Sequence, residues 1–363
     1  MQREKWTKRD RLCAAAAALL FAAAAVLQFA ARFADGFADW YARRVYPAVV
    51  GVFGRFFGLF SFSAVEMLLY AGIVCGILYL AGQLRRPFGA ASRVLLTAAA
   101  LLFLYMTGCG INYHAAAFSS YADLTAGTYT KEELTALCEY LTDQVNAYVP
   151  LERETYAYKS NREAWRRDSV QAMKAAGALY PVLAGYYPEP KEVAVSWILS
   201  VQQLSGVYSP FTVEANYNGD MPDYNIPHTM CHELSHLKGF MREDEANFIG
   251  YLACILSENP AFRYSGYLTG WVYAGNALAQ ADPETYSGLY GRLCLEARED
   301  LLENNAFWDQ FEGRVAEVST RWNDAYLKMN AQEDGVRSYG RMVDLMLARQ
   351  RQEAEKSAGE LEE

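Results

Sequence analysis

The chain opens with three long apolar runs separated by polar or interrupted segments. They cover residues 12–31, 64–82 and 94–112. A helix needs about 20 residues to cross the hydrocarbon core of a bilayer, so each run is long enough. The pattern therefore predicts three membrane-spanning helices. We interpret the first run as an uncleaved anchor and not as a signal peptide, because its apolar core is long and two further spans follow.

Between the first two spans lies a fourth apolar stretch, residues 45–62. It is interrupted by Pro47, three glycines and Arg55. A charge midway through a short run is costly in hydrocarbon, so the sequence favours an interfacial or re-entrant segment over a further span. Residues 1–113 thus form the predicted membrane region, and the lipid bilayer is a predicted partner.

The pattern changes after residue 113 and indicates a mainly helical soluble domain at residues 114–349. Thr130-Lys131-Glu132-Glu133 has the form of a capping box and predicts a helix to about Val149, and residues 162–184 predict another. Residues 192–199 and 208–218 are rich in β-branched and aromatic side chains and predict a small sheet or hairpin. Helical patterns follow from Asn247. The charged tail, residues 350–363, is predicted to fray or to be disordered. The predicted fold class is mainly α with a small β-sheet behind three membrane helices.

Charge divides the chain in the same place. Residues 1–113 hold twelve Lys and Arg against five Asp and Glu, whereas the whole chain has a net charge of −9. Phosphates would be repelled by so acidic a soluble domain, which argues against nucleic acid as a partner. The basic flanks of the spans predict a cytoplasmic amino terminus. Three spans then place everything after about residue 114 outside the cytoplasmic membrane.

The stretch from His228 to Phe248 reads HTMCHELSHLKGFMREDEANF and contains three of the four histidines. His232 and His236 are four residues apart, so on a helix both imidazoles lie on one face and can converge on one ion. Glu233 projects about 100° around the helix, beside that face. This is the geometry of HExxH, in which two neutral imidazoles bind Zn²⁺ and the carboxylate takes a proton from the water that the metal activates.

The start of the helix that carries this motif is predicted by Pro227, which stands at an expected first helical position. The alternative, an exposed helix with incidental histidines, is disfavoured because the motif follows strand-like residues and ends at a glycine. His228 is not a predicted ligand, since it lies about 12 Å from His236 along the helix axis and Zn–N bonds are only about 2.1 Å long. It is expected to be a wall residue, a residue that supports a metal ligand, or helix surface.

The third zinc ligand is expected from the segment after the helix. Gly239 can adopt the left-handed conformation that ends a helix, so the acidic residues beyond it can return to the metal. Glu243 is the predicted ligand, with Glu245 as the alternative. Asn247, four residues after Glu243, is predicted to hydrogen-bond a ligand imidazole and to fix its tautomer.

HELSH followed by a short glycine turn and ExxAN resembles the zincin metallopeptidases of the gluzincin type, whose third metal ligand is a glutamate. In them the first Glu of ExxxD or ExxAN binds the metal, which corresponds to Glu243. Most of the chain also resembles a bacterial membrane family, domain-of-unknown-function family 3810, through FSAVEMLLY, SPFTVEANYN, HELSHLKGFMREDEANF, NPAFRYSGYLTGW and EDGVRSYGRMVDL. These resemblances imply a zincin-like α+β domain that carries peptidase chemistry.

Two further groups of residues are candidates for contact with a substrate. In zincins an edge strand ahead of the metal helix pairs with the substrate backbone, which makes Ala215, Asn216 and Tyr217 candidates; an ordinary hairpin is the alternative. Near the end of the chain, Tyr339 is a candidate for stabilising the negative charge that develops in amide hydrolysis. A structural role for Tyr339 is the alternative.

The function expected from the sequence is a membrane-anchored zinc metallopeptidase that acts on a peptide or protein at the outer face of the cytoplasmic membrane. His232, His236 and Glu243 would bind Zn²⁺, and Glu233 would be the general base. One alternative is a zinc-binding, non-catalytic interaction module. Another is an intramembrane protease, which the polar flanks NGDMPDYN and KGFMREDEAN disfavour.

Overall fold

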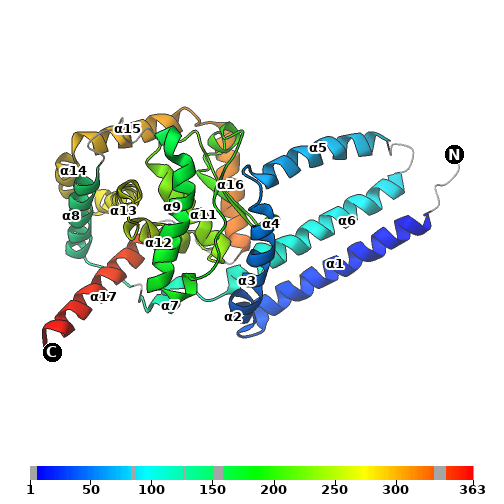
Figure 1. Cartoon of the computed structure of the whole chain (residues 1–363), viewed down its shortest axis with the longest axis horizontal. Helices are drawn as coiled ribbons and strands as arrows, with labels where there is room; N and C mark the ends of the chain where they lie inside the picture. The colour runs from blue at the N-terminus through cyan, green and yellow to red at the C-terminus, as the bar shows by residue number, and fades with distance from the viewer. Residues whose placement is uncertain (1–5, 83–86, 126, 150–157, 331–340, 363) are drawn as a thin grey trace. The chain divides into compact units, whose positions relative to one another are not determined.

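The computed structural model describes all residues except 1–5, 83–86, 126, 150–157, 331–340 and 363 (Figure 1). The chain divides into two compact units. The first contains Met1–Ala116 together with the short segment Ser209–Glu214, and the second contains Ala117–Tyr208 and Ala215–Glu363.

Outside the segment Ser209–Glu214, the described secondary structure of the first unit is helical. Its elements are α1 (Lys8–Phe33), α2 (Phe37–Trp40), η1 (Tyr41–Val45), α3 (Tyr46–Val49), η2 (Val50–Gly54), α4 (Arg55–Phe57), α5 (Ala64–Gly82), α6 (Pro87–Tyr105), η3 (Met106–Gly110) and η4 (Asn112–His114). Three stretches, Lys8–Phe33, Ala64–Gly82 and Gly89–His114, are helices long and apolar enough to cross a membrane. The predicted membrane helices are confirmed in this sense.

Helices α1 and α6 lie side by side (Figure 1). Along α1 the buried positions include Ala17, Ala24 and Ala31, one every seven residues. Such a spacing keeps small side chains on one face of a helix, and small side chains let two membrane helices approach closely. The large apolar residues of α1, such as Leu19 and Phe29, lie exposed on other faces, as expected for side chains that contact lipid.

The interrupted stretch between α1 and α5 forms short helices with two π-helical turns, η1 and η2. Turn η1 ends two residues before Pro47, whose ring lacks an N–H and crowds the carbonyl of the preceding turn. A wider π turn relieves that crowding. Among the described residues this stretch is not one of the three candidate membrane spans.

A carboxylate caps the start of α5. Glu214 accepts hydrogen bonds from the backbone N–H of Ala64 (3.1 Å) and of Val65 (2.9 Å) and is only 3% exposed. The first N–H groups of a helix lack partners within it, and they carry partial positive charge that a carboxylate neutralises. These contacts hold segment Ser209–Glu214 to the membrane helices of the first unit.

The second unit surrounds a small sheet with helices. Its elements are α7 (Phe118–Ala122), α8 (Lys131–Tyr148), α9 (Tyr158–Leu179), η5 (Pro181–Leu183), β1 (Lys191–Glu192), α10 (Trp197–Ser200), β2 (Gly206–Ser209), β3 (Glu214–Tyr217), α11 (Asn225–Lys238), α12 (Glu243–Ile255), α13 (Pro260–Ala281), α14 (Pro283–Arg292), α15 (Leu295–Asp309), α16 (Arg314–Met329) and α17 (Met342–Glu362). The strand order is β1-β3-β2, and β1 pairs parallel with β3 in the register Lys191↔Asn216. The predicted fold class is confirmed.

Local sequence patterns predicted some elements of the second unit correctly and others wrongly. Thr130 and Glu133 form the predicted capping box of α8. Of the predicted strand at 192–199 only Glu192 lies in β1, and Trp197 begins the short helix α10, so that prediction is wrong over most of its length. The spacing of the apolar residues in this segment suits a strand or a helix, and tertiary contacts decide which of the two forms.

Two chain boundaries also differ from expectation. Helix α11 begins at Asn225, so Pro227 is its third residue and not its first. Proline is tolerated there because the first four N–H groups of a helix have no partner within it. Helix α17 continues to Glu362, through the segment for which the sequence predicts disorder. Pairs four residues apart, such as Arg349–Glu353 at 2.7 Å, favour helix there.

Candidate functional site

Helix α11 is a buried helix, not a surface one. Every residue from Ile226 to Leu237 is buried, and α11 packs against α9, α12 and α13 (Figure 1). The interpretation as an exposed helix with incidental histidines is therefore wrong. Buried polar side chains must find partners or a ligand, since each one left unpaired costs about 1–3 kcal/mol. The hydrogen-bond partners of the polar side chains of α11 therefore show which residues have a structural role and which can bind a ligand.

His228 serves structure. Its ring Nε2 lies 3.1 Å from the carbonyl oxygen of Asn247 in α12, and its backbone N–H donates to Ser265 Oγ in α13 at 3.0 Å. Burial lowers the pKa of His228 to about 3, so the ring is neutral and donates one N–H to that carbonyl. This accords with the expectation that His228 is a wall residue and not a ligand.

The turn after α11 brings Glu243 back to the two other histidines. Gly239 ends α11 with φ +108°, a left-handed conformation that favours glycine, and α12 begins at Glu243. One Glu243 oxygen, Oε2, lies 3.4 Å from His232 Nε2, and the other, Oε1, lies 3.6 Å from His236 Nε2. The two Nε2 atoms are 3.0 Å apart. One donor atom from each residue can be chosen so that all lie within 4.8 Å of one another.

These distances fit a zinc ion. Two ligand atoms about 2.1 Å from a tetrahedral Zn²⁺ lie about 3.4 Å from each other. The separations of 3.0, 3.4 and 3.6 Å scatter around that value. Two imidazoles and one carboxylate are also a donor set typical of catalytic zinc, which keeps a fourth position open. His232, His236 and Glu243 therefore form a candidate metal cluster.

The charges of the cluster reinforce this reading. Burial by itself raises the pKa of Glu243, but the neighbouring His236 and His232 outweigh it, so the pKa of Glu243 lies well below its ordinary value. Burial lowers the pKa of His236, and the Glu243 carboxylate more than offsets this, so the pKa of His236 is raised. The carboxylate is thus held ionised, as a metal ligand must be, and a bound metal ion would replace the proton that this carboxylate favours on His236.

The orientation of His236 comes from a backbone group that the sequence did not indicate. His236 Nδ1 lies 2.8 Å from the carbonyl oxygen of Phe240, which can only accept, so Nδ1 carries the proton and Nε2 keeps its lone pair for a metal. Asn247 was predicted for this role. Among the described residues its side chain forms no hydrogen bond with either ligand imidazole, and its Nδ2 has no partner. The geometry assigns the positioning of His236 to Phe240.

Glu245, the alternative ligand, points elsewhere. It is 4% exposed and accepts a hydrogen bond of 2.7 Å from the backbone N–H of Phe118, the first residue of α7. It thus caps α7 in the way that Glu214 caps α5. Glu245 lies two positions after Glu243, so the two side chains project about 200° apart around α12. Only Glu243 joins the described cluster.

Glu233 lies beside the cluster without belonging to it. Its Oε1 is 4.0 Å from His232 Nε2, the side chain is 3% exposed, and Oε2 has no hydrogen-bond partner among the described residues. Burial raises the pKa of Glu233 to about 7. A buried carboxyl that lies beside a metal cluster and keeps one oxygen without a partner is arranged to exchange protons with a molecule bound there.

Strand β2 closes over Glu233. A Cβ atom at Gly206 would lie 2.6 Å from Glu233 Oε1 and 2.8 Å from the carbonyl oxygen of Asn216. Glycine is therefore required at this position for the strand to approach the carboxylate so closely. Gly206 is part of the candidate site, and no sequence pattern indicates it because the close approach depends on the tertiary fold.

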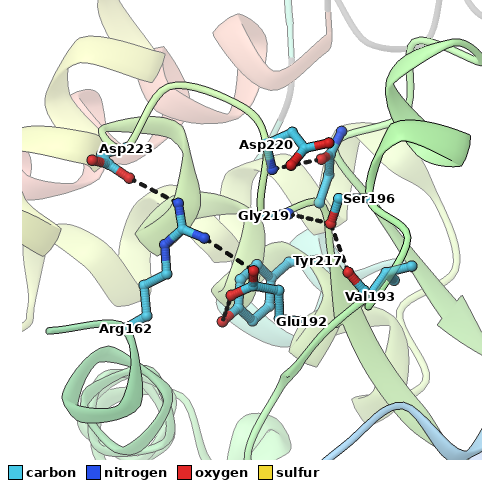
Figure 2. A network of polar contacts seen from close by, with 9 residues as sticks. Arg162, Glu192, Val193, Ser196, Tyr217, Gly219, Asp220 and Asp223 are labelled. Atoms are coloured by element: carbon cyan, nitrogen blue, oxygen red, sulfur yellow. Dashed lines mark hydrogen bonds and ion pairs between the residues drawn. The ribbon is translucent and has the colours of Figure 1, made fainter. Parts of the chain in front are cut away.

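A polar network fixes the loop that leads into α11 (Figure 2). Arg162 of α9 pairs with Glu192 of β1 at 3.1 Å and with Asp223 at 3.2 Å, one residue before the cap of α11. Tyr217 of β3 donates to Glu192. In the same loop, the Gly219 N–H donates to Ser196 Oγ at 2.8 Å. The network ties α9, the sheet and the start of α11 together, so it sets where the histidines lie.

The candidate substrate contacts need correction. Strand β3 lies between β1 and β2, so Ala215, Asn216 and Tyr217 occupy the central strand and not an edge. Their backbone groups face neighbouring strands, and all are buried, so pairing with a substrate backbone is not open to them. Tyr339 falls outside the described residues.

Tyr273 of α13 is a further residue that sequence reasoning missed. Burial, followed by the charge of the Glu243 carboxylate, raises the pKa of the Tyr273 phenol. The run YLTGWVYAG that contains it has the spacing of core residues, and that pattern hid its position.

Fold and site together define a membrane-anchored, mainly α-helical protein with a cluster of two histidines and one glutamate. Residues 41–347 match the family described as protein of unknown function (DUF3810), and the chain belongs to this family. The match begins after α1, which ends at Phe33. No curated protein and no solved structure matches the chain.

Proposed function

We propose that the chain is a membrane-anchored zinc metallopeptidase that hydrolyses peptide bonds. The observation that carries the proposal is the convergence of His232, His236 and Glu243, with donor atoms within 4.8 Å, beside the buried and partly unpartnered carboxyl of Glu233. The resemblance of HELSH and ExxAN to gluzincins supports the same conclusion from the sequence.

Each residue has a distinct task in this proposal. His232 and His236 would hold Zn²⁺ through Nε2, and Glu243 through its carboxylate. Bound zinc supplies a Lewis acid that polarises the substrate carbonyl and makes water more acidic. Glu233 takes one proton from the attacking water while the C–O bond forms, and passes it to the amide nitrogen as the C–N bond breaks. The products are a carboxylic acid and an amine.

The non-catalytic alternative explains less. A structural zinc site needs ligands only, whereas Glu233 is buried at 3% exposure with an oxygen left without a partner. Keeping such a group costs free energy that a purely structural module has no reason to bear. The intramembrane alternative is also disfavoured, since α11 is not among the described helices with the length and hydropathy of a span.

The proposed site faces the outside of the cytoplasmic membrane. Basic residues flank the amino terminus and the connection between the second and third spans, which favours placing both in the cytoplasm. An odd number of spans then leaves the second unit on the opposite side. The substrate would be a peptide or protein outside the cell membrane.

Removal of the metal tests both the proposed peptidase activity and the side of the membrane on which the site lies. In right-side-out vesicles that contain the full chain, a chelator that does not cross membranes is expected to abolish hydrolysis of an added quenched-fluorescence peptide library, and Zn²⁺ to restore it. Hydrolysis that appears only after the vesicles are opened would place the site inside. Hydrolysis that resists the chelator in detergent as well would refute the zinc peptidase.

Gly206→Ala is expected to lower the hydrolysis rate about 10- to 100-fold, because the new methyl group displaces the Glu233 carboxyl and small misplacements are costly in catalysis. Zinc content, measured by mass spectrometry, should stay unchanged. Gly288→Ala is the matched control, because a Cβ there meets nothing within 4 Å. Equal rates for both variants would show that β2 does not constrain Glu233.

A further inference from the structure

Helix α16 carries an apolar face that no described residue covers. Val315, Val318, Trp322 and Met329 are between 43% and 77% exposed. Their spacing of three, four and seven residues places them on one side of the helix. We call these four residues the exposed α16 face. The opposite side of α16 faces the protein, since Ala316 and Leu327 are buried.

Basic side chains run along one edge of this face. Arg314, Arg321 and Lys328 are exposed and seven residues apart, so they form a row beside the apolar stripe. Glu317 and Asp324 lie beyond that row, farther from the stripe. A stripe that contains tryptophan and is bordered by Arg and Lys is the pattern of a helix that lies in the interface of an anionic bilayer.

The connection between the two units favours a bilayer as the partner of the exposed α16 face. The third candidate span ends at His114 and the second unit begins at Ala117, so the unit leaves the membrane through a short connection. A short tether keeps the unit at a high effective concentration near the lipid surface. A modest apolar area therefore suffices for a stable contact.

A second copy of the chain fits the face less well. Helix α16 has 16 residues. It therefore offers about two heptads, whereas helix pairing as a coiled coil requires about three or four. The bulky Trp322 at the centre of the stripe is also poorly suited to a narrow seam between two helices, while its indole suits the boundary between head groups and acyl chains.

We propose that the exposed α16 face inserts at the head-group boundary of the bilayer that holds the membrane helices. The apolar side chains enter the outer acyl region, and the basic row contacts anionic head groups, with its aliphatic stems lying along the lipid. The second unit is thereby held to the membrane at a second point, independently of any metal or of hydrolysis.

Brominated lipids test the insertion of Trp322 in the full chain. The protein is placed in nanodiscs of phosphatidylethanolamine and phosphatidylglycerol, with or without bromine near the head-group end of the acyl chains. The fluorescence of Trp322 is obtained as wild type minus Trp322→Phe, and that of the control Trp197 as wild type minus Trp197→Phe. Trp197 is also exposed, at 59%, and lies on α10. Bromination is expected to reduce the Trp322 signal at least about twofold and to leave the Trp197 signal unchanged.

Two further conditions complete the test. Replacing phosphatidylglycerol by phosphatidylcholine should weaken the quenching, and so should Val318→Asp, which alters only an exposed position. Equal quenching of both tryptophans, or ready quenching of Trp322 by aqueous iodide, would overturn the proposal. Protection of Trp322 from iodide without quenching by bromine would identify a second copy as the occupant, and would overturn it as well.

Discussion

Replacing Glu233 by glutamine is expected to lower the rate of peptide hydrolysis by about 10²- to 10⁴-fold, the range that a general acid–base group contributes. Glutamine has the size of glutamate and keeps one acceptor oxygen, but it cannot take a proton from water. Because Glu233 lies beside the cluster of His232, His236 and Glu243 and is not part of it, zinc should remain bound at one ion per chain.

The measurement pairs the hydrolysis rate with the zinc content of the same preparation. Loss of activity with zinc retained supports the role of Glu233 as the proton carrier. Loss of both would mean that Glu233 ligates the metal. Unchanged hydrolysis by the Glu233→Gln variant would remove the peptidase proposal, because contaminating proteases would then account for the activity. A comparison of new amino termini in cells that carry the two forms would identify the substrate.

Features that depend on local sequence were predictable. Membrane helices follow from the length and hydropathy of one segment, and the capping box of α8 from Thr130 and Glu133 alone. The pairing of His232 with His236 follows from four-residue spacing on one helix, and Gly239 ends that helix as its type suggests. In each case the interacting groups are within a few residues of each other.

Features that depend on contacts between distant segments were not predictable from the sequence. Of Glu243 and Glu245, only Glu243 joins the described cluster, because the backbone N–H of Phe118, 127 positions away, binds the Glu245 carboxylate. The central place of β3 depends on β1 arriving on its other side, which no pattern within the 208–218 segment records. Gly206 and Phe240 act through backbone approach and a backbone carbonyl, and neither leaves a side-chain signature.

The second large expected effect is on zinc binding, because Glu243 is the proposed ligand and Glu245 caps α7. Glu243→Gln is expected to weaken zinc binding by more than about 100-fold, beyond the 10- to 100-fold typical of groups that only support ligands. The amide is uncharged and a poor zinc ligand, and it leaves the two imidazoles without the negative charge that now lies 3.4 Å and 3.6 Å from them. Competition with a fluorescent zinc indicator measures the affinity, and hydrolysis should fall in parallel.

Glu245 supplies the matched control within the same helical turn. Glu245→Gln keeps an acceptor for the Phe118 N–H, so zinc affinity and hydrolysis are expected to stay near wild type. Glu245→Ala removes that acceptor and leaves a buried N–H unpaired, which should cost about 1–3 kcal/mol of unfolding free energy without loss of zinc. If Glu245→Gln lost zinc and Glu243→Gln kept it, the ligand set would be wrong, and α12 would have to rotate about its axis to exchange the two carboxylates. The capped N-terminus of α7 argues against that rotation, because it would break the hydrogen bond that fixes the helix in its present register.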